Sequence, residues 1–198
     1  MLRQGVHPPG KSIGNDLEVT FSGYSFAGGK PYGECRTNFR RDEITKTHGY
    51  RATIRWTGNQ GSGTARFDGY SRDHVIELEG KPPLSGSADP AFRGDRERTT
   101  PEEMLLASIS TCHMLWFLHI ASTKGLVVES YEDNAEAVMA TNRDGSGQFT
   151  SATLRPHVTL SAGDPSVADS AHHKAHQMCF IVRSLNFDVS CEGTVAAV

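Results

Sequence analysis

The sequence lacks several features that would assign a function directly. It has no internal repeat, no Gly-rich nucleotide-binding loop and no stripe of basic residues. With a formal net charge of -3, it does not have the composition of a nucleic-acid-binding protein. The N-terminal segment MLRQGVHPPGK has no apolar core of the kind found in signal peptides, so we expect no secretion signal and a cytoplasmic location.

Cysteine is scarce as well. The chain of 198 residues holds four cysteines: Cys35, Cys112, Cys179 and Cys191. In a chain of this length without a secretion signal, they favour buried or reactive thiols in a reducing compartment over a framework of structural disulfides.

Long apolar runs are limited to one, at residues 104–121. Its length approaches that of a membrane span. The run contains polar residues, Ser108, Ser110, Thr111, His113 and His119. No second run of this kind is present, so we predict a core helix and no membrane association.

This helix has a well-marked start and end. Thr100 suits the N-cap, Pro101 the first helical position, and Glu103 completes a capping box with Thr100. Gly125 is suited to ending the helix, because glycine readily adopts the left-handed conformation that follows a helix C-terminus.

The remaining pattern predicts an α+β domain over residues 47–198. Strands with alternating or apolar patterns are expected at residues 50–57, 64–73, 74–78, 126–139, 149–161 and 187–195. A long loop at 80–99 precedes the central helix. A second helix, begun by Asp164 and Pro165, is expected to reach about Leu185. Short links between strands favour antiparallel sheets packed on two helices.

Residues 1–46 show no clear periodicity. They are rich in glycine and include Pro8, Pro9 and Pro31. We predict an N-terminal extension that is poorly ordered or contains a short hairpin at residues 21–24.

Cys112 and Cys179 are the strongest candidates for chemistry. Each thiol could simply pack as a small apolar side chain. The alternative is a peroxidatic and resolving pair, in which one thiolate becomes a sulfenic acid and the second thiol condenses with it. A peroxidatic thiolate needs a cationic neighbour, and the arginines of the loop at 80–99 can provide one.

Glu102 lies ten residues before Cys112 in the same predicted helix. At the rise of a helix this spacing corresponds to about 15 Å, so the two side chains cannot meet within one chain. If both belong to one site, Glu102 must come from a second subunit in an isologous dimer. Otherwise Glu102 only stabilises the helix dipole.

A metal site is a competing hypothesis. His172, His176 and Cys179 have spacings of four and three residues, which place them on one face of the second predicted helix, and imidazole and thiolate suit zinc. No fourth ligand is evident nearby. His113 and His119 are more typical of core histidines, although His113 could also tune Cys112.

These residues resemble the OsmC/Ohr family, the osmotically inducible and organic hydroperoxide resistance proteins. The resemblance covers residues 48–198 and rests on Thr-Pro-Glu-Glu-Met-Leu at 100–105 ahead of Cys112, on Cys179, and on the loop at 87–95. It implies an OsmC-like fold, with antiparallel sheets around two central helices in an intertwined homodimer.

The resemblance also implies a thiol-dependent peroxidase that reduces organic hydroperoxides and is regenerated by a dithiol. Cys112 would be peroxidatic and Cys179 resolving, with a Cys112–Cys179 disulfide as intermediate. Glu102 would pair with an arginine, for which Arg93 is the first choice, Arg98 the second and Arg72 the third. No cofactor and no metal are implied.

The chain departs from the family pattern at Phe180, where better-known members have a proline that opens a helix. Cys35 and Cys191 receive no role. Two other functions remain open at this point: a non-catalytic protein that binds a small hydrophobic ligand on the same fold, and a His/Cys metal-binding protein.

Overall fold

The computed structural model describes residues 46–198. The predicted N-terminal extension, its hairpin and Cys35 lie outside the described residues. The helices and strands follow in the order β1 (Ala52–Trp56), β2 (His74–Leu78), β3 (Leu84–Gly86), α1 (Pro101–Thr123), β4 (Val127–Asp133), β5 (Glu136–Thr141), β6 (Gly147–Leu154), β7 (Pro156–Ala162), α2 (Ala168–Met178), β8 (Asp188–Cys191) and β9 (Thr194–Ala197). Short 3-10 turns occur at η2 (Pro90–Phe92), η3 (Pro165–Val167) and η4 (Val182–Ser184).

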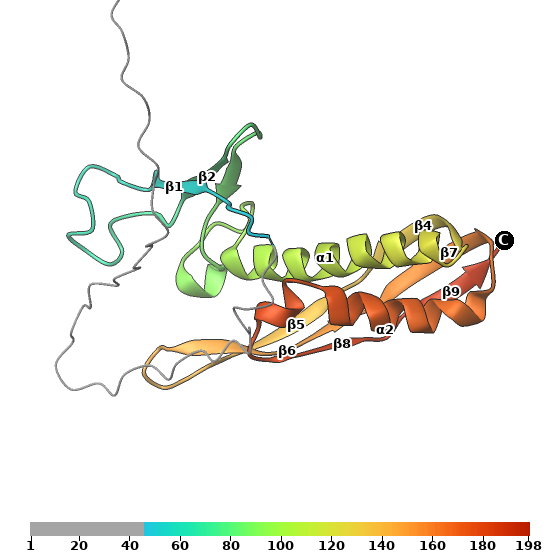
Figure 1. Cartoon of the computed structure of the whole chain (residues 1–198). Helices are drawn as coiled ribbons and strands as arrows, with labels where there is room; N and C mark the ends of the chain where they lie inside the picture. The colour runs from blue at the N-terminus through green and yellow to red at the C-terminus, as the bar shows by residue number, and fades with distance from the viewer. Residues whose placement is uncertain (1–45) are drawn as a thin grey trace, which may run out of the picture. The chain divides into compact units, whose positions relative to one another are not determined.

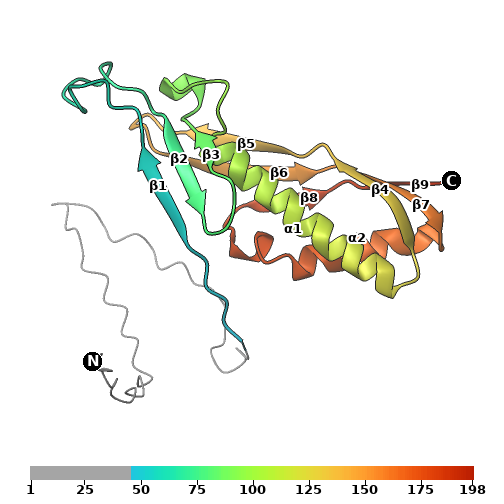
Figure 2. The same ribbon diagram turned by 90° about the horizontal axis from the view of Figure 1, so that it is seen from above.

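The strands form three small sheets, with orders β1-β2-β3, β4-β7-β9 and β5-β6-β8. Helices α1 and α2 lie side by side along the two later sheets, as both ribbon views show (Figures 1 and 2). The prediction of an α+β fold with two helices is confirmed. The β1-β2-β3 sheet is antiparallel as expected, whereas the two later sheets are mixed, because β8 and β9 run parallel to β6 and β7.

Helix α1 begins and ends as the sequence predicts. The Thr100 side chain accepts a hydrogen bond from the Glu103 backbone at 3.2 Å, and the Glu103 carboxylate accepts one from the Thr100 backbone at 2.8 Å. Gly125 has a φ of 76°, and the following Leu126 donates its N–H to the Ala121 carbonyl at 3.0 Å. This closing turn satisfies carbonyls that would otherwise be left unpaired at the helix end.

One face of α1 forms the core. Its buried residues recur every three or four positions: Ile109, His113, Phe117, Ile120 and Ala121. They pack against α2, whose buried positions are mostly small, with Ala168, Ala171 and Ala175 fully buried. Alanine at these positions lets the two helices approach closely, and the burial of apolar surface between them stabilises the fold.

Several predicted boundaries were wrong. The second helix ends at Met178, short of Leu185, and Cys179 follows it in an extended conformation. Residues 64–73 form turns rather than a strand. The strand predicted at 50–57 is shorter and exposed along its whole length, although its alternation predicted one buried face.

The length and apolar composition of α1 also meet the criteria for a membrane-spanning helix. The core helix of a soluble protein meets the same criteria, so this observation is weak evidence. In the structure, α1 packs one face against α2 and a strand of the sheet next to it.

The capping box gives a direct test of the start of α1. We expect Thr100→Ala to lower the free energy of unfolding by about 1 kcal/mol, because the Glu103 backbone N–H loses its acceptor. Urea unfolding followed by circular dichroism measures the change. The matched control is Thr99→Ala, since Thr99 is exposed and pairs through its backbone with Ser85 and Ser87. An equal loss in both variants would contradict a specific contribution from the cap.

Candidate active site

Cys112 and Cys179 meet where the middle of α1 passes the end of α2. Cys112 lies on the side of α1 that faces away from the core and is partly exposed, whereas Cys179 is fully buried. Both are free thiols, and Cys112 is close enough to Cys179 to affect the protonation of the Cys179 thiol. The structure therefore brings together two residues that are sixty-seven positions apart in the sequence.

The two thiols have different surroundings. Burial, with a smaller contribution from the neighbouring Cys112, raises the pKa of Cys179 to about 11. Backbone hydrogen bonds from Val182 and Ile181 act in the opposite direction but do not outweigh burial. Cys179 is thus protonated at neutral pH, which makes it a poor nucleophile.

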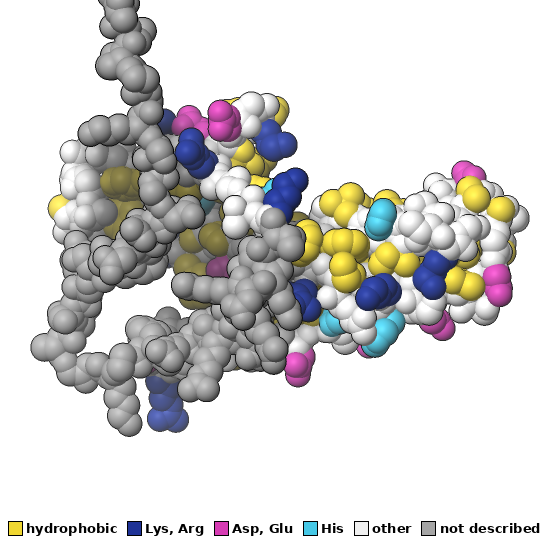
Figure 3. All heavy atoms as spheres, viewed as in Figure 1, with side chains coloured by type: hydrophobic (Ala, Val, Ile, Leu, Met, Phe, Trp, Pro, Cys, Tyr) yellow, Lys and Arg dark blue, Asp and Glu magenta, His cyan; other side chains and the backbone are white. Residues whose placement is uncertain are grey.

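An open cavity of about 870 Å³ borders Cys112. Its walls come from the outward side of α1, the segment after Cys179 and the residues before β1: His48, Tyr50, Ser108, Thr111, Cys112, Leu115, Trp116, His119, Phe180 and Ile181. The Trp116 and Phe180 rings pack edge to face with centroids 5.6 Å apart. Hydrophobic side chains are visible over α1 in the space-filling view (Figure 3). The cavity is suited to an apolar ligand.

Glu102 lies in the first turn of α1, and its Oε2 atom is buried without a hydrogen-bond partner among residues 46–198. In that part of the chain no ion pair involves Glu102. A buried carboxylate oxygen without a hydrogen-bond donor is energetically unfavourable. A donor from outside residues 46–198 would therefore stabilise Glu102.

The three arginines considered for Glu102 have other contacts within the chain. Arg98 forms ion pairs with Asp95 at 3.2 Å and Asp73 at 3.6 Å. Arg72 donates to the backbone carbonyls of Tyr70 and Phe67. Arg93 is exposed, has a left-handed φ of 68°, and places its guanidinium 5.5 Å from the centre of the Phe67 ring. Of the three, Arg93 has the weakest contacts and keeps its hydrogen-bond donors most available.

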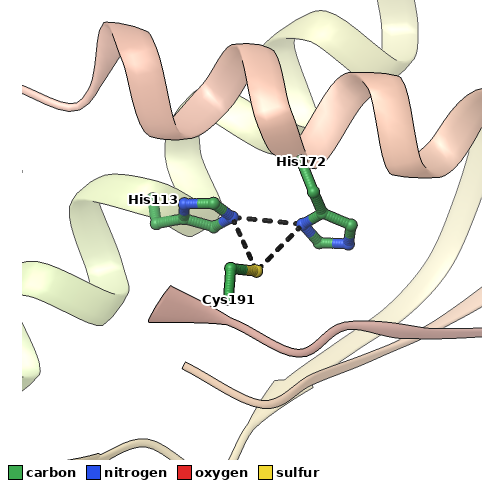
Figure 4. A group of neighbouring side chains, drawn as sticks. All are labelled: His113, His172 and Cys191. Atoms are coloured by element: carbon green, nitrogen blue, oxygen red, sulfur yellow. Dashed lines mark hydrogen bonds between the residues drawn. The ribbon is translucent and has the colours of Figure 1, made fainter. Parts of the chain in front are cut away.

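A second cluster lies on the other side of α1. His113 and His172 are buried, and the Nε2 atom of His113 lies 3.1 Å from the Nδ1 atom of His172 (Figure 4). The Cys191 sulfur lies 3.7 Å and 3.9 Å from these two nitrogens. Burial lowers the pKa of both histidines to about 4, so both imidazoles are neutral at pH 7. Burial raises the pKa of Cys191 to about 11.

The ligand set that the sequence suggested for a metal differs from the group that the structure brings together. Among residues 46–198, the group of His, Cys and acidic residues arranged to hold an ion is His113, His172 and Cys191. The predicted set of His172, His176 and Cys179 is not brought together as one group, because α2 ends before Cys179. His113 also does not contact Cys112, since adjacent residues of a helix point in different directions.

The sequence alone assigned no role to Cys191, although the alternating pattern of its strand indicated which way its side chain points. It occupies the same side of the closing strand as Val189, in a stretch where inward and outward residues alternate. The alternation placed Cys191 toward the core, but nothing in the sequence showed which helices it would face.

Comparison with known proteins agrees with this architecture. The model of the OsmC-like protein family matches residues 94–192, half of the chain, which include Cys112 and Cys179. An uncharacterised protein of Bacillus subtilis, YmaD, is 29% identical over 110 residues, covering 52% of this chain and 71% of that protein. An organic hydroperoxide resistance protein from Elizabethkingia anophelis has a TM-score of 0.56 at 13% identity, over 78% of this chain and 100% of that one.

A solved OsmC-like protein of unknown function from Vibrio cholerae is more similar in sequence. It is 32% identical, with a TM-score of 0.68, and the match covers 75% of this chain and 100% of that chain. The matched family model and this level of identity over a complete relative together lead to one conclusion: the chain belongs to the OsmC-like protein family.

Proposed function

We propose that this protein is a thiol-dependent peroxidase that reduces organic hydroperoxides through Cys112 and Cys179. The observation that supports the proposal is the position of two free thiols close to each other, with Cys112 at the wall of an open apolar cavity and Cys179 buried behind it. The OsmC-like family contains organic hydroperoxide resistance proteins, which agrees with this chemistry.

The surroundings of the thiols suggest their roles. Cys112 borders the cavity and would attack the peroxide, whereas Cys179 is fully buried and would resolve the intermediate. The Cys112 thiolate attacks one peroxide oxygen, the O–O bond breaks, and the alkoxide leaves as an alcohol after it takes up a proton. Cys112 is then a sulfenic acid. The Cys179 sulfur attacks Cys112, water leaves, and a disulfide forms.

The cavity favours an organic substrate over hydrogen peroxide. Leu115, Trp116, Phe180 and Ile181 provide apolar surface next to Cys112, and an alkyl or aryl group would lose contact with water there. Hydrogen peroxide has no apolar group and would gain little from these walls. A cellular dithiol would restore both cysteines by thiol–disulfide exchange, and we place this cycle in the reducing cytoplasm.

Activation of Cys112 would involve a second subunit in a homodimer. The unpartnered oxygen of Glu102 and the exposed guanidinium of Arg93 are complementary groups. Because Glu102 and Cys112 are about 15 Å apart along α1, the proposed dimer would place Glu102 of one subunit near the Cys112 site of the other. The exposed strand β1 and the open side of α1 offer apolar surface for such a contact.

Turnover of hydroperoxides tests the proposal. With dithiothreitol as reductant, we expect the protein to reduce cumene and tert-butyl hydroperoxide faster than hydrogen peroxide. Cys112→Ser should lower the rate by about 1000-fold or more, since the reacting sulfur is absent. Ser122→Ala, in the exposed last turn of the same helix, is the matched control and should keep full activity. Peptide mapping after one equivalent of peroxide should find a Cys112–Cys179 disulfide.

Two results would contradict the peroxidase. The first is a Cys112→Ser variant with full activity. The second is a wild-type protein that loses no thiols on exposure to the hydroperoxides. In the second case, a hydrophobic probe that still binds in the cavity would favour the alternative, a non-catalytic protein for small ligands.

The assigned roles also predict different thiol reactivity. Iodoacetamide should label Cys112 first, and labelling of Cys179 should accelerate about tenfold per pH unit without levelling below pH 10, because the raised pKa leaves little thiolate there. Mass spectrometry of timed samples measures both rates. Faster labelling of Cys179 than of Cys112 near pH 7 would reverse the assignment.

The arginine that pairs with Glu102 in the proposed site can be identified by comparing variants of the loop at residues 80–99. We expect Arg93→Ala to lower the peroxidase rate, because the thiolate site would lose its proposed cation. Arg96→Ala is the matched control, because Arg96 is an exposed arginine of the same loop. Initial rates with cumene hydroperoxide and dithiothreitol measure the loss. If Arg98→Ala produces the loss and Arg93→Ala does not, Arg98 is the partner instead.

A further inference from the structure

Three metal-ligating side chains converge from three separate elements. His113 comes from the middle of α1, His172 from α2 and Cys191 from the last residue of β8, and Figure 4 shows their donor atoms pointing toward one another. This cluster is distinct from the Cys112 and Cys179 pair, to which we assign the proposed peroxidase chemistry.

The distances fit tetrahedral coordination. Around zinc, two nitrogen ligands lie about 3.3 Å apart and a nitrogen and a sulfur about 3.5 Å apart, given the usual metal–ligand bond lengths. The corresponding distances here are 3.1 Å for the two nitrogens, and 3.7 Å and 3.9 Å from the sulfur to each nitrogen. Movements of a few tenths of an ångström would therefore complete one face of a coordination tetrahedron.

Hydrogen bonding alone accounts for only part of the arrangement. The two imidazoles can share one proton along the 3.1 Å contact, but the sulfur distances are long for strong hydrogen bonds. The Tyr131 hydroxyl, buried nearby, has no hydrogen-bond partner among residues 46–198. Its ring lies 6.4 Å from that of His172. A water on an ion beside Cys191 would give this hydroxyl a partner.

The cluster can be reached from the surface. A cavity of about 410 Å³ is lined by Asp169, His172, His173, His176, Cys191 and Glu192, among others. The two carboxylates attract cations to its mouth. Each imidazole can offer a ring-nitrogen lone pair to an ion, and a bound cation promotes loss of the Cys191 proton.

We propose that His113, His172 and Cys191 form a zinc site, with a water molecule as the fourth ligand. The set of two imidazoles and one thiolate suits this ion in both ligand type and geometry. The bound ion would join α1, α2 and β8, and so stabilise the folded chain independently of the two reacting cysteines.

Metal binding to the chelator-treated full-length protein tests the proposal. We expect one Zn²⁺ per chain, measured by competition with a chromophoric chelator. Co²⁺ in its place should give a thiolate-to-cobalt charge-transfer band. Cys191→Ser should weaken binding by about 100-fold or more and remove the band. His173→Ala, at the exposed rim of the same cavity, is the matched control and should retain both.

Two further measurements separate this site from the other thiols and from a folding defect. Cys112→Ser should keep the stoichiometry and the band. In the wild-type protein, Zn²⁺ should protect Cys191 from alkylation and leave Cys112 reactive, a result that needs no variant at Cys191. The proposal is overturned if the wild-type protein binds no Zn²⁺, if Cys191→Ser keeps the band, or if Cys112→Ser loses it.

Discussion

The packing of α1 against α2 is the contact on which the rest of the structure depends. Phe117 and its neighbours on one face of α1 are buried against alanines of α2, including Ala171 and Ala175, and this close approach fixes both helices. The β-strands that surround the helices then have a defined surface to cover. Both clusters of functional side chains are set by the same contact, because each uses one residue from α1 and one from the α2 region.

Adjacent residues of one helix serve two different environments. Cys112 and His113 point in different directions from α1, so Cys112 faces the open cavity and His113 faces the core. The helix is apolar around most of its circumference, which allows one side to be buried and the other to bind apolar molecules. Because α1 has one open side and one buried side, Cys112 lies next to Cys179, whereas His113 lies next to Cys191. The thiol that we propose to react with peroxide and the thiol that we propose to bind zinc are thereby kept apart.

Local signals in the sequence gave reliable predictions. The start of α1 at Thr100 and its end at Gly125 depend on hydrogen bonds between residues a few positions apart, so these boundaries were correct. The single strand predicted at 187–195 is divided into β8 and β9, which belong to different sheets, but the alternation was correct for Cys191. The α+β class followed from the order of these elements. The family resemblance added the importance of Cys112 and Cys179, but the structure alone shows that their thiols are neighbours.

Other features depended on contacts between distant parts of the chain. The second helix was expected to continue because its sequence remains apolar past Met178, yet the chain turns there and directs Cys179 toward Cys112. Parallel pairing of β8 and β9 has no local signature, since it depends on which edge of each sheet is free. By itself, the sequence determined the central helix, its caps and the position of Cys112 in the middle of that helix, since those features arise from short-range hydrogen bonding and periodicity. Only the tertiary structure decided that His113, His172 and Cys191 meet, because their approach requires α1, α2 and β8 to pack together first.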